Sequence, residues 1–190
     1  MLELPADVSL GYRPATPHEI HCWSFGAISQ VRMADAHTWQ QNRKTLDDEA
    51  IFGPRRDFAC CCGKYRGMQY ERMICDRCGV KIASSTIRRS RFGHIDLPTA
   101  IPHPLAAVSF GVSALPVLPA AFVESARGAK LTDLYEEVLR ACGSPGADAI
   151  ASAVARVFEA IYPIAVEAHG CNLQDASTLL HGLALIERER

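Results

Sequence analysis

Four cysteines in the first half of the chain have the spacing of a metal site. Cys60 and Cys62 form a C-x-C pair, and after twelve residues Cys75 and Cys78 form a C-x-x-C pair. Two such pairs on tight turns can approach one ion from two sides, and four thiolates complete the tetrahedral shell that Zn²⁺ prefers. A catalytic zinc keeps one position open for water, and four thiolates leave none. The pattern therefore predicts one structural Zn²⁺.

Glycines mark the turns of this predicted site. Gly63 and Gly79 each follow the second cysteine of a pair, where glycine relieves the strain of a sharply turning backbone. Cys61 lies between two ligands, and neighbouring side chains of an extended segment point apart, so we interpret it as a non-ligand. An exchange of ligand roles between Cys60 and Cys61 stays open.

The other cysteines indicate no second thiol chemistry. A redox C-x-x-C needs an exposed thiol of low pKa in a βαβ context, which this sequence lacks. A thiol or redox enzyme using Cys61 or Cys171 remains as an alternative hypothesis. We interpret the isolated residues Cys22, Cys142 and Cys171 as core residues, because free cysteine is commonly buried.

Basic charge gathers around the cysteines. From Arg55 to Arg91 there are ten Lys and Arg against three Asp and Glu, a net charge of +7, whereas the rest holds ten against eighteen, a net charge of −8. A phosphate backbone needs such charge, and the interleaved Tyr65, Tyr70 and Phe92 could stack on bases. An acidic protein surface is an equally supported partner. The candidate residues for binding nucleic acid or protein are Lys64, Arg66, Arg72, Arg77, Arg88, Arg89 and Arg91.

The helices and strands expected to position these residues make up an α+β fold. We expect a zinc ribbon with short antiparallel strands, followed by a small helical C-terminal bundle. The composition divides the chain into an irregular segment packing on the ribbon (1–50), the zinc ribbon (51–96), a Pro-rich apolar linker (97–125) and a helical C-terminal region (126–190).

Three amphipathic helices are predicted in the last third, and they need one another or the linker to bury their apolar stripes. The first has apolar residues at helical spacing: Leu131, Leu134, Tyr135, Val138 and Leu139. A second begins near Ala147, and Pro163 is expected to kink or end it. A third is expected after Asn172, with one face formed by Leu173, Ala176, Leu180, Leu183 and Ile186.

A membrane span is not expected. The longest uncharged stretch, Leu97–Val123, contains five prolines, which would leave backbone carbonyls unpaired in lipid. It is interpreted as buried strand and turn. The first residues lack the basic start and apolar core of a signal peptide. We therefore expect a cytoplasmic protein whose cysteines bind metal rather than form disulfides. His94 and His103 flank the stretch and are not expected as ligands, because the zinc shell is already filled.

Several motifs resemble one known family. They are Trp23–Gly26, Ile51–Pro54, Cys60–Tyr65, Ile74–Val80 and Arg88–Leu97. In this order and close to this spacing, they resemble the N-terminal zinc-binding region of the β′ subunit of bacterial DNA-directed RNA polymerase. Two further segments are more weakly similar to the family's approach to the lid and to the start of its clamp helices: Leu115–Pro119 and Leu131–Tyr135.

The resemblance implies a role for the region and shows two departures. In the family, the ribbon lies on the clamp near the RNA exit channel and upstream DNA, with the four cysteines as zinc ligands and nearby arginines as candidates for contact. The D-x-D-x-D triad that holds the catalytic magnesium is absent here. The family's basic clamp helix is replaced by an acidic one with Asp133, Glu136 and Glu137, which breaks at Gly143.

These observations predict a β′-like zinc-ribbon protein of transcription that does not catalyse alone. It is expected to bind RNA polymerase subunits, DNA or RNA through its basic face, and no small-molecule substrate is expected. The alternative is one piece of a split DNA-directed RNA polymerase whose active site lies on another chain.

Overall fold

The computed structural model describes residues 11–32, 38–104, 111–123, 129–144, 146–168 and 185–188. Helices and strands both occur, which confirms the predicted α+β class. Within the described ranges the elements are β1 (Gly11–Pro14), α1 (Pro17–Trp23), β2 (Ser24–Ala27), α2 (Glu49–Phe52), the 3-10 helices η1 (Met68–Tyr70) and η2 (Ser85–Arg89), β3 (Phe92–Ile101), β4 (Val112–Val117), α3 (Ala120–Val123), α4 (Ala129–Cys142), α5 (Ala147–Ala168) and β5 (Leu185–Arg188).

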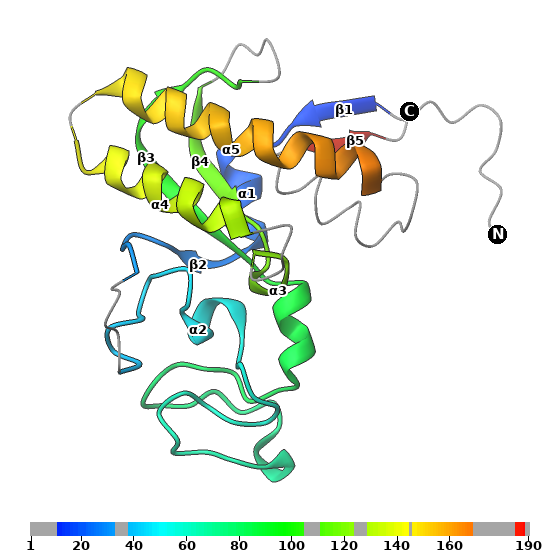
Figure 1. The fold of residues 1–190 in the computed structure, drawn as a ribbon. Helices are drawn as coiled ribbons and strands as arrows, with labels where there is room; N and C mark the ends of the chain where they lie inside the picture. The colour runs from blue at the N-terminus through cyan, green and yellow to red at the C-terminus, as the bar shows by residue number, and fades with distance from the viewer. Residues whose placement is uncertain are drawn as a thin grey trace, which may run out of the picture.

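A three-stranded sheet forms the centre of the molecule, in the order β2-β3-β4 (Figure 1). β2 runs parallel to β3, and β4 runs antiparallel to it. The β3–β4 register shifts between Asp96 and Ile101, around Pro98, which has no N–H to donate to a ladder. Pro116 is tolerated in β4 because this strand lies at the edge of the sheet.

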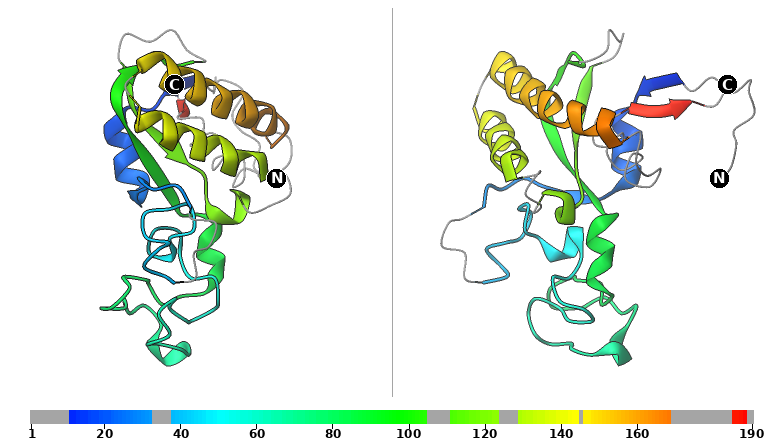
Figure 2. Two further views of the ribbon diagram at one scale, coloured as in Figure 1. Left: turned by 60° about the vertical axis from the view of Figure 1, so that its left-hand side comes forward. Right: turned by 45° about the vertical axis from the view of Figure 1, so that its right-hand side comes forward.

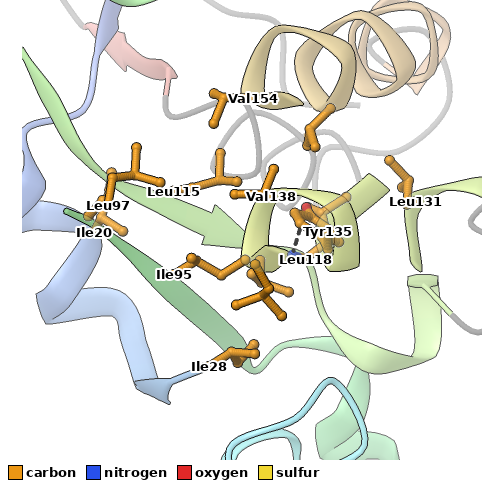
Figure 3. Close-up of a cluster of buried hydrophobic side chains, with 14 of the residues drawn as sticks. Ile20, Ile28, Ile95, Leu97, Leu115, Leu118, Leu131, Tyr135, Val138 and Val154 are labelled. Carbon is orange, nitrogen blue, oxygen red and sulfur yellow. Dashed lines mark hydrogen bonds between the residues drawn. The ribbon is translucent and has the colours of Figure 1, made fainter. Parts of the chain in front are cut away.

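Helices cover both faces of this sheet. α4 and α5 lie on one face, and α1 lies on the other (Figure 2). The stripes predicted for the first two helices are buried in the core, as Tyr135, Val138 and Val154 illustrate (Figure 3). Burying each such apolar side chain contributes about 1.5–3 kcal/mol. The fully buried Tyr135 hydroxyl accepts the Leu118 N–H at 3.4 Å and donates to the Pro116 carbonyl at 3.5 Å.

The C-terminal third follows its prediction in part. α5 continues through Pro163 to Ala168, so of the two outcomes predicted for this residue, a kink or an end of the helix, the second does not occur. The third predicted helix lies mostly outside the described residues, but its last part is wrong because Ile186 belongs to strand β5. β5 pairs antiparallel with β1, with Ile186 opposite Arg13. Such a partner, far away in the sequence, is invisible to an argument from local periodicity.

The uncharged stretch contributes strands to the sheet. It contains the second half of β3, all of β4 and the short helix α3, and most of the described apolar side chains of β4 are buried. No helix in the described ranges is both long enough and apolar enough to cross a membrane.

Residues 58–82, here called the cysteine lobe, project from the body as a set of loops (Figure 1). Antiparallel pairing in the lobe is confined to two isolated bridges, Ala59↔Arg66 and Ile74↔Lys81. Its small core is separate from the main one and surrounds Val80 and Ile82, both 0% exposed. The lobe belongs to the long crossover that joins the parallel strands β2 and β3.

Candidate metal centre

Two loops with the same hydrogen-bonding pattern carry the four cysteines. The Cys60 N–H donates to the Tyr65 carbonyl at 3.1 Å, and the Cys75 N–H donates to the Val80 carbonyl at 2.9 Å. The acceptor is five residues beyond the donor in both loops, and one of the two bridges closes each loop behind its first cysteine. Each loop is therefore a short hairpin tip that presents its cysteines on one side.

The predicted glycines occupy the turns of these loops. Gly63 and Gly79 have φ values of 76° and 73°, in the left-handed region that side chains other than glycine rarely adopt. The Gly63 N–H donates to the Cys60 carbonyl at 3.0 Å, and the Gly79 N–H donates to the Cys75 carbonyl at 2.8 Å. Glycine thus permits the tight return of the backbone next to the sulfur atoms.

The structure brings the four sulfur atoms together. The Sγ atoms of Cys60, Cys62, Cys75 and Cys78 all lie within 4.8 Å of one another. The Cys60–Cys62 and Cys62–Cys75 sulfur pairs are 3.5 and 3.6 Å apart. A Zn–S bond of about 2.3 Å in a tetrahedral shell puts neighbouring sulfurs about 3.8 Å apart. The donor set and its spacing therefore fit a Zn²⁺ ion held by four thiolates.

Electrostatics also favour a cation at this point. Burial is the main factor that raises the pKa of Cys62 and of Cys78, in each case to about 12. At Cys75 burial acts in the same direction, but the backbone N–H groups of Cys78 and Arg77 outweigh it and hold the pKa at about 7. Thiolates at Cys62 and Cys78 thus require a positive ion close by, because these two groups otherwise keep their protons.

Cys61 lies outside this group of four sulfurs. The residue is exposed, and partial desolvation of its sulfur is the main factor that raises its pKa to about 11. At neutral pH such a thiol is protonated and a poor nucleophile, which argues against Cys61 as the reactive thiol of an enzyme. Of the cysteines interpreted as core residues, Cys22 is exposed and Cys142 is half-buried, whereas Cys171 lies outside the described residues.

The candidate basic residues divide into an exposed and an interior set. The exposed ones are Lys64, Arg66, Arg72, Arg77 and Arg89. Among them, Lys64 already donates to both carboxylate oxygens of Asp76, at 2.8 and 2.6 Å. The exposed positive charge of the cysteine lobe and its border is therefore smaller than the sequence count indicates.

Arg88 and Arg91 belong to the interior set, with 5% and 7% of their surface exposed. Arg88 donates to the Gly53 carbonyl at 2.8 Å. The Arg91 guanidinium lies 4.5 Å from the centre of the Phe25 ring, a cation–π distance. Arg88 thus joins two segments of the crossover, and Arg91 packs the end of the crossover against β2. Both side chains therefore leave little surface for contact with nucleic acid. Sequence alone gives no signal of this, because arginine is usually exposed.

A second group of potential ligands was missed by the sequence analysis. His21, His94 and Asp96 each have a ligand atom within 4.8 Å of those of the other two. His94 and Asp96 alternate in one strand and so share a face, which is a signal visible in the sequence. His21 is on α1 and joins them only in the folded chain.

Comparisons with known proteins agree with the motif order. No family model matches the chain. A segment of 89 residues, 47% of the chain, is 47% identical to the DNA-directed RNA polymerase subunit β′ of Rhodopirellula baltica. The same subunit is 46% identical over 89 residues in Deinococcus radiodurans and 43% identical in Lactobacillus delbrueckii subsp. bulgaricus. The resemblance is thereby confirmed for just under half of the chain.

The match covers a small part of those relatives. It spans 6% of the subunit from Rhodopirellula baltica and 7% of that from Lactobacillus delbrueckii subsp. bulgaricus. The similarity therefore says nothing about the activities of the remaining parts of the β′ subunit.

Proposed function

We propose that this chain is a β′-like component of transcription that binds RNA polymerase or nucleic acid and holds one structural Zn²⁺ in its cysteine lobe. The observation that carries the proposal is the identity of 43–47% over 89 residues to β′ subunits. The zinc ligands are proposed to be Cys60, Cys62, Cys75 and Cys78, and the grouping of their sulfur atoms supports this assignment.

The proposed role is binding rather than catalysis. The chain has no D-x-D-x-D triplet to hold magnesium, which nucleotidyl transfer by a β′ subunit requires. A catalytic site, if the protein acts inside a polymerase, is proposed to lie outside these 190 residues.

The cysteine lobe is a better candidate for the contact surface than α4. Glu136 accepts hydrogen bonds from Arg32 at 2.7 Å and from Arg140 at 3.1 Å, and it is 8% exposed. Glu137 pairs with Arg156 of α5. Glu136 and Glu137 thus hold α4 to the segment after β2 and to α5. By contrast, Arg66, Arg72, Arg77 and Arg89 are exposed on or next to the lobe.

Co-purification from the protein's own cell extract tests the proposal. The zinc-loaded chain is expected to retain polymerase subunits at moderate salt. Retention at one copy per polymerase through high salt indicates a piece of a split enzyme, whereas loss at high salt indicates a regulator. Finding neither polymerase nor nucleic acid on the protein at low salt would contradict the proposal.

Matched charge variants locate the surface. Replacing Arg66 and Arg77 by alanine is expected to weaken the interaction, whereas replacing Lys44 and Lys130, which are exposed outside the lobe, leaves it intact. If the partner is duplex DNA, each lost phosphate contact lowers the salt slope of the binding constant by about 0.9. Equal affinity of the two double variants for the partner would show that the cysteine lobe is not the contact surface.

A further inference from the structure

A cluster of two histidines and one carboxylate lies apart from the cysteine lobe, where α1 packs against the sheet. It consists of His21 from the last turn of α1 and of His94 and Asp96 from β3. Imidazole nitrogen and carboxylate oxygen are both ligands for first-row transition metals. The described residues contain one other group of this kind, the four cysteines.

The carboxylate of Asp96 lies close to both imidazoles. His21 Nε2 is 2.8 Å from Oδ1 of Asp96, and His94 Nε2 is 3.5 Å from Oδ2 of the same side chain. The two rings meet edge to face, with their centroids 4.6 Å apart. Three potential ligand atoms from two elements therefore face one small volume.

A hydrogen bond orients the ring of His94. His94 Nδ1 lies 2.7 Å from the Ser24 hydroxyl oxygen, which accepts from the Gly26 N–H at 3.1 Å and lies 3.1 Å from the Gly26 carbonyl. When the hydroxyl donates to this carbonyl, its oxygen can accept the Nδ1 proton of His94. In that tautomer, which a metal requires, the lone pair of Nε2 faces Asp96. A second hydrogen bond that fixes ring and tautomer is the usual arrangement around metal-binding histidines.

Exposure is graded across the cluster. The side chain of His94 is 11% exposed, whereas those of His21 and Asp96 are 46% and 60% exposed. One ligand is therefore held rigidly by the interior, and the other two can adjust at the surface. Solvent can reach the cluster, so an ion can arrive there and water can complete its shell.

The geometry points to a second metal site, in which His21, His94 and Asp96 bind a divalent first-row transition ion of the Zn²⁺ class. Three protein ligands of mixed nitrogen and oxygen leave at least one position for water, unlike the closed four-sulfur set. The site differs from the cysteine lobe in donors, exposure and position in the fold. It does not depend on the proposed role in transcription, because its ligands and its test are independent of any partner.

Metal titration of the full chain, already carrying one zinc in the cysteine lobe, tests this inference. A second equivalent of Zn²⁺ is expected to bind and to shift the imidazole nitrogen resonances of His21 and His94. With Co²⁺ as the second equivalent, the spectrum is expected to lack thiolate-to-metal charge transfer. His21→Gln and Asp96→Asn are each expected to lower the affinity for the second equivalent at least about tenfold. Binding of the first zinc and the circular dichroism spectrum are expected to stay unchanged.

His18→Gln is the matched control, because His18 lies on the same helix but outside the cluster. It is expected to bind the second equivalent as the wild type does. The inference is wrong if the wild type stops at one zinc per chain under excess zinc, or if His21→Gln and Asp96→Asn bind a second ion normally. It is also wrong if His18→Gln loses the second ion equally, which would indicate adventitious binding by surface histidines.

Discussion

Lys64 of the first cysteine loop donates to both carboxylate oxygens of Asp76 in the second, at 2.8 and 2.6 Å. The contact joins the tips of the two loops across the four sulfur atoms. Both side chains are well exposed, at 41% and 65%, so water and salt screen the attraction. The pair therefore orients the tips, and the proposed zinc ion is expected to hold the loops together.

Lys64→Ala is accordingly expected to leave the zinc content at one per chain and to change the unfolding free energy very little. Zinc analysis and denaturant unfolding at two salt concentrations check this. Loss of zinc from this variant would show that the ion pair, and not the thiolates, determines the geometry of the lobe.

Cys75→Ser is expected to lose the zinc and to unfold the cysteine lobe, because the small core around Val80 and Ile82 cannot fold it alone. Cys61→Ser is the matched control and should keep the metal, because Cys61 lies outside the sulfur group. Zinc content, limited proteolysis of the lobe and thermal melting are the measurements. A zinc-free Cys75→Ser protein with an unchanged melting profile would contradict the prediction.

Tyr135→Phe is expected to destabilise the body by about 1–2 kcal/mol, since the buried Leu118 N–H loses its acceptor. Tyr162→Phe on α5 is the control, because Tyr162 is 50% exposed and its hydroxyl can be replaced by water. Denaturant unfolding of the zinc-loaded variants measures both. Equal stability of Tyr135→Phe and the wild type would show that the Leu118 N–H finds another partner.

Lowering the pH is expected to destabilise the first turn of α1, because Glu19 becomes protonated. A hydrogen bond from Arg13, followed by one from the Thr16 N–H, lowers the pKa of Glu19 from 4.5 to about 2. A depressed pKa in the folded state contributes stability above pH 4.5, and this contribution is lost as the pH falls towards about 2.

Glu19→Gln should therefore be less stable than the wild type at neutral pH, by about 1 kcal/mol. The difference between the two proteins should shrink as the pH falls through this window. Acid also releases zinc from both proteins. Because this loss of stability is common to both, it cancels in the difference between them at each pH. A difference that is constant with pH would rule out the charge of Glu19 as its cause.

The features predicted from sequence are those set by short-range rules. The four cysteines and two glycines follow from the local geometry of metal-binding turns, and the stripe from Leu131 to Leu139 follows from helical periodicity. The resemblance to β′ rests on the same kind of local motif, and the comparisons confirm it.

The missed features depend on distant partners. β5 forms because β1, from the other end of the chain, lies beside it. Arg88 is buried with a hydrogen bond to the Gly53 carbonyl, and Arg91 is buried with its guanidinium over the Phe25 ring. Neither contact leaves a pattern in the sequence. His21 meets Asp96 across 75 positions, so only the fold reveals the second cluster.

The parallel pairing of β2 with β3 has a consequence for the order of events during synthesis. The two strands are separated by residues 28–91, which are 64 residues that include all four clustered cysteines. At about 5–20 residues per second, a ribosome completes β2 about 3–13 seconds before β3 begins to appear. The four cysteines of the proposed zinc site thus leave the ribosome before the sheet can close, so we expect the zinc supply during translation to influence which part of the protein folds first.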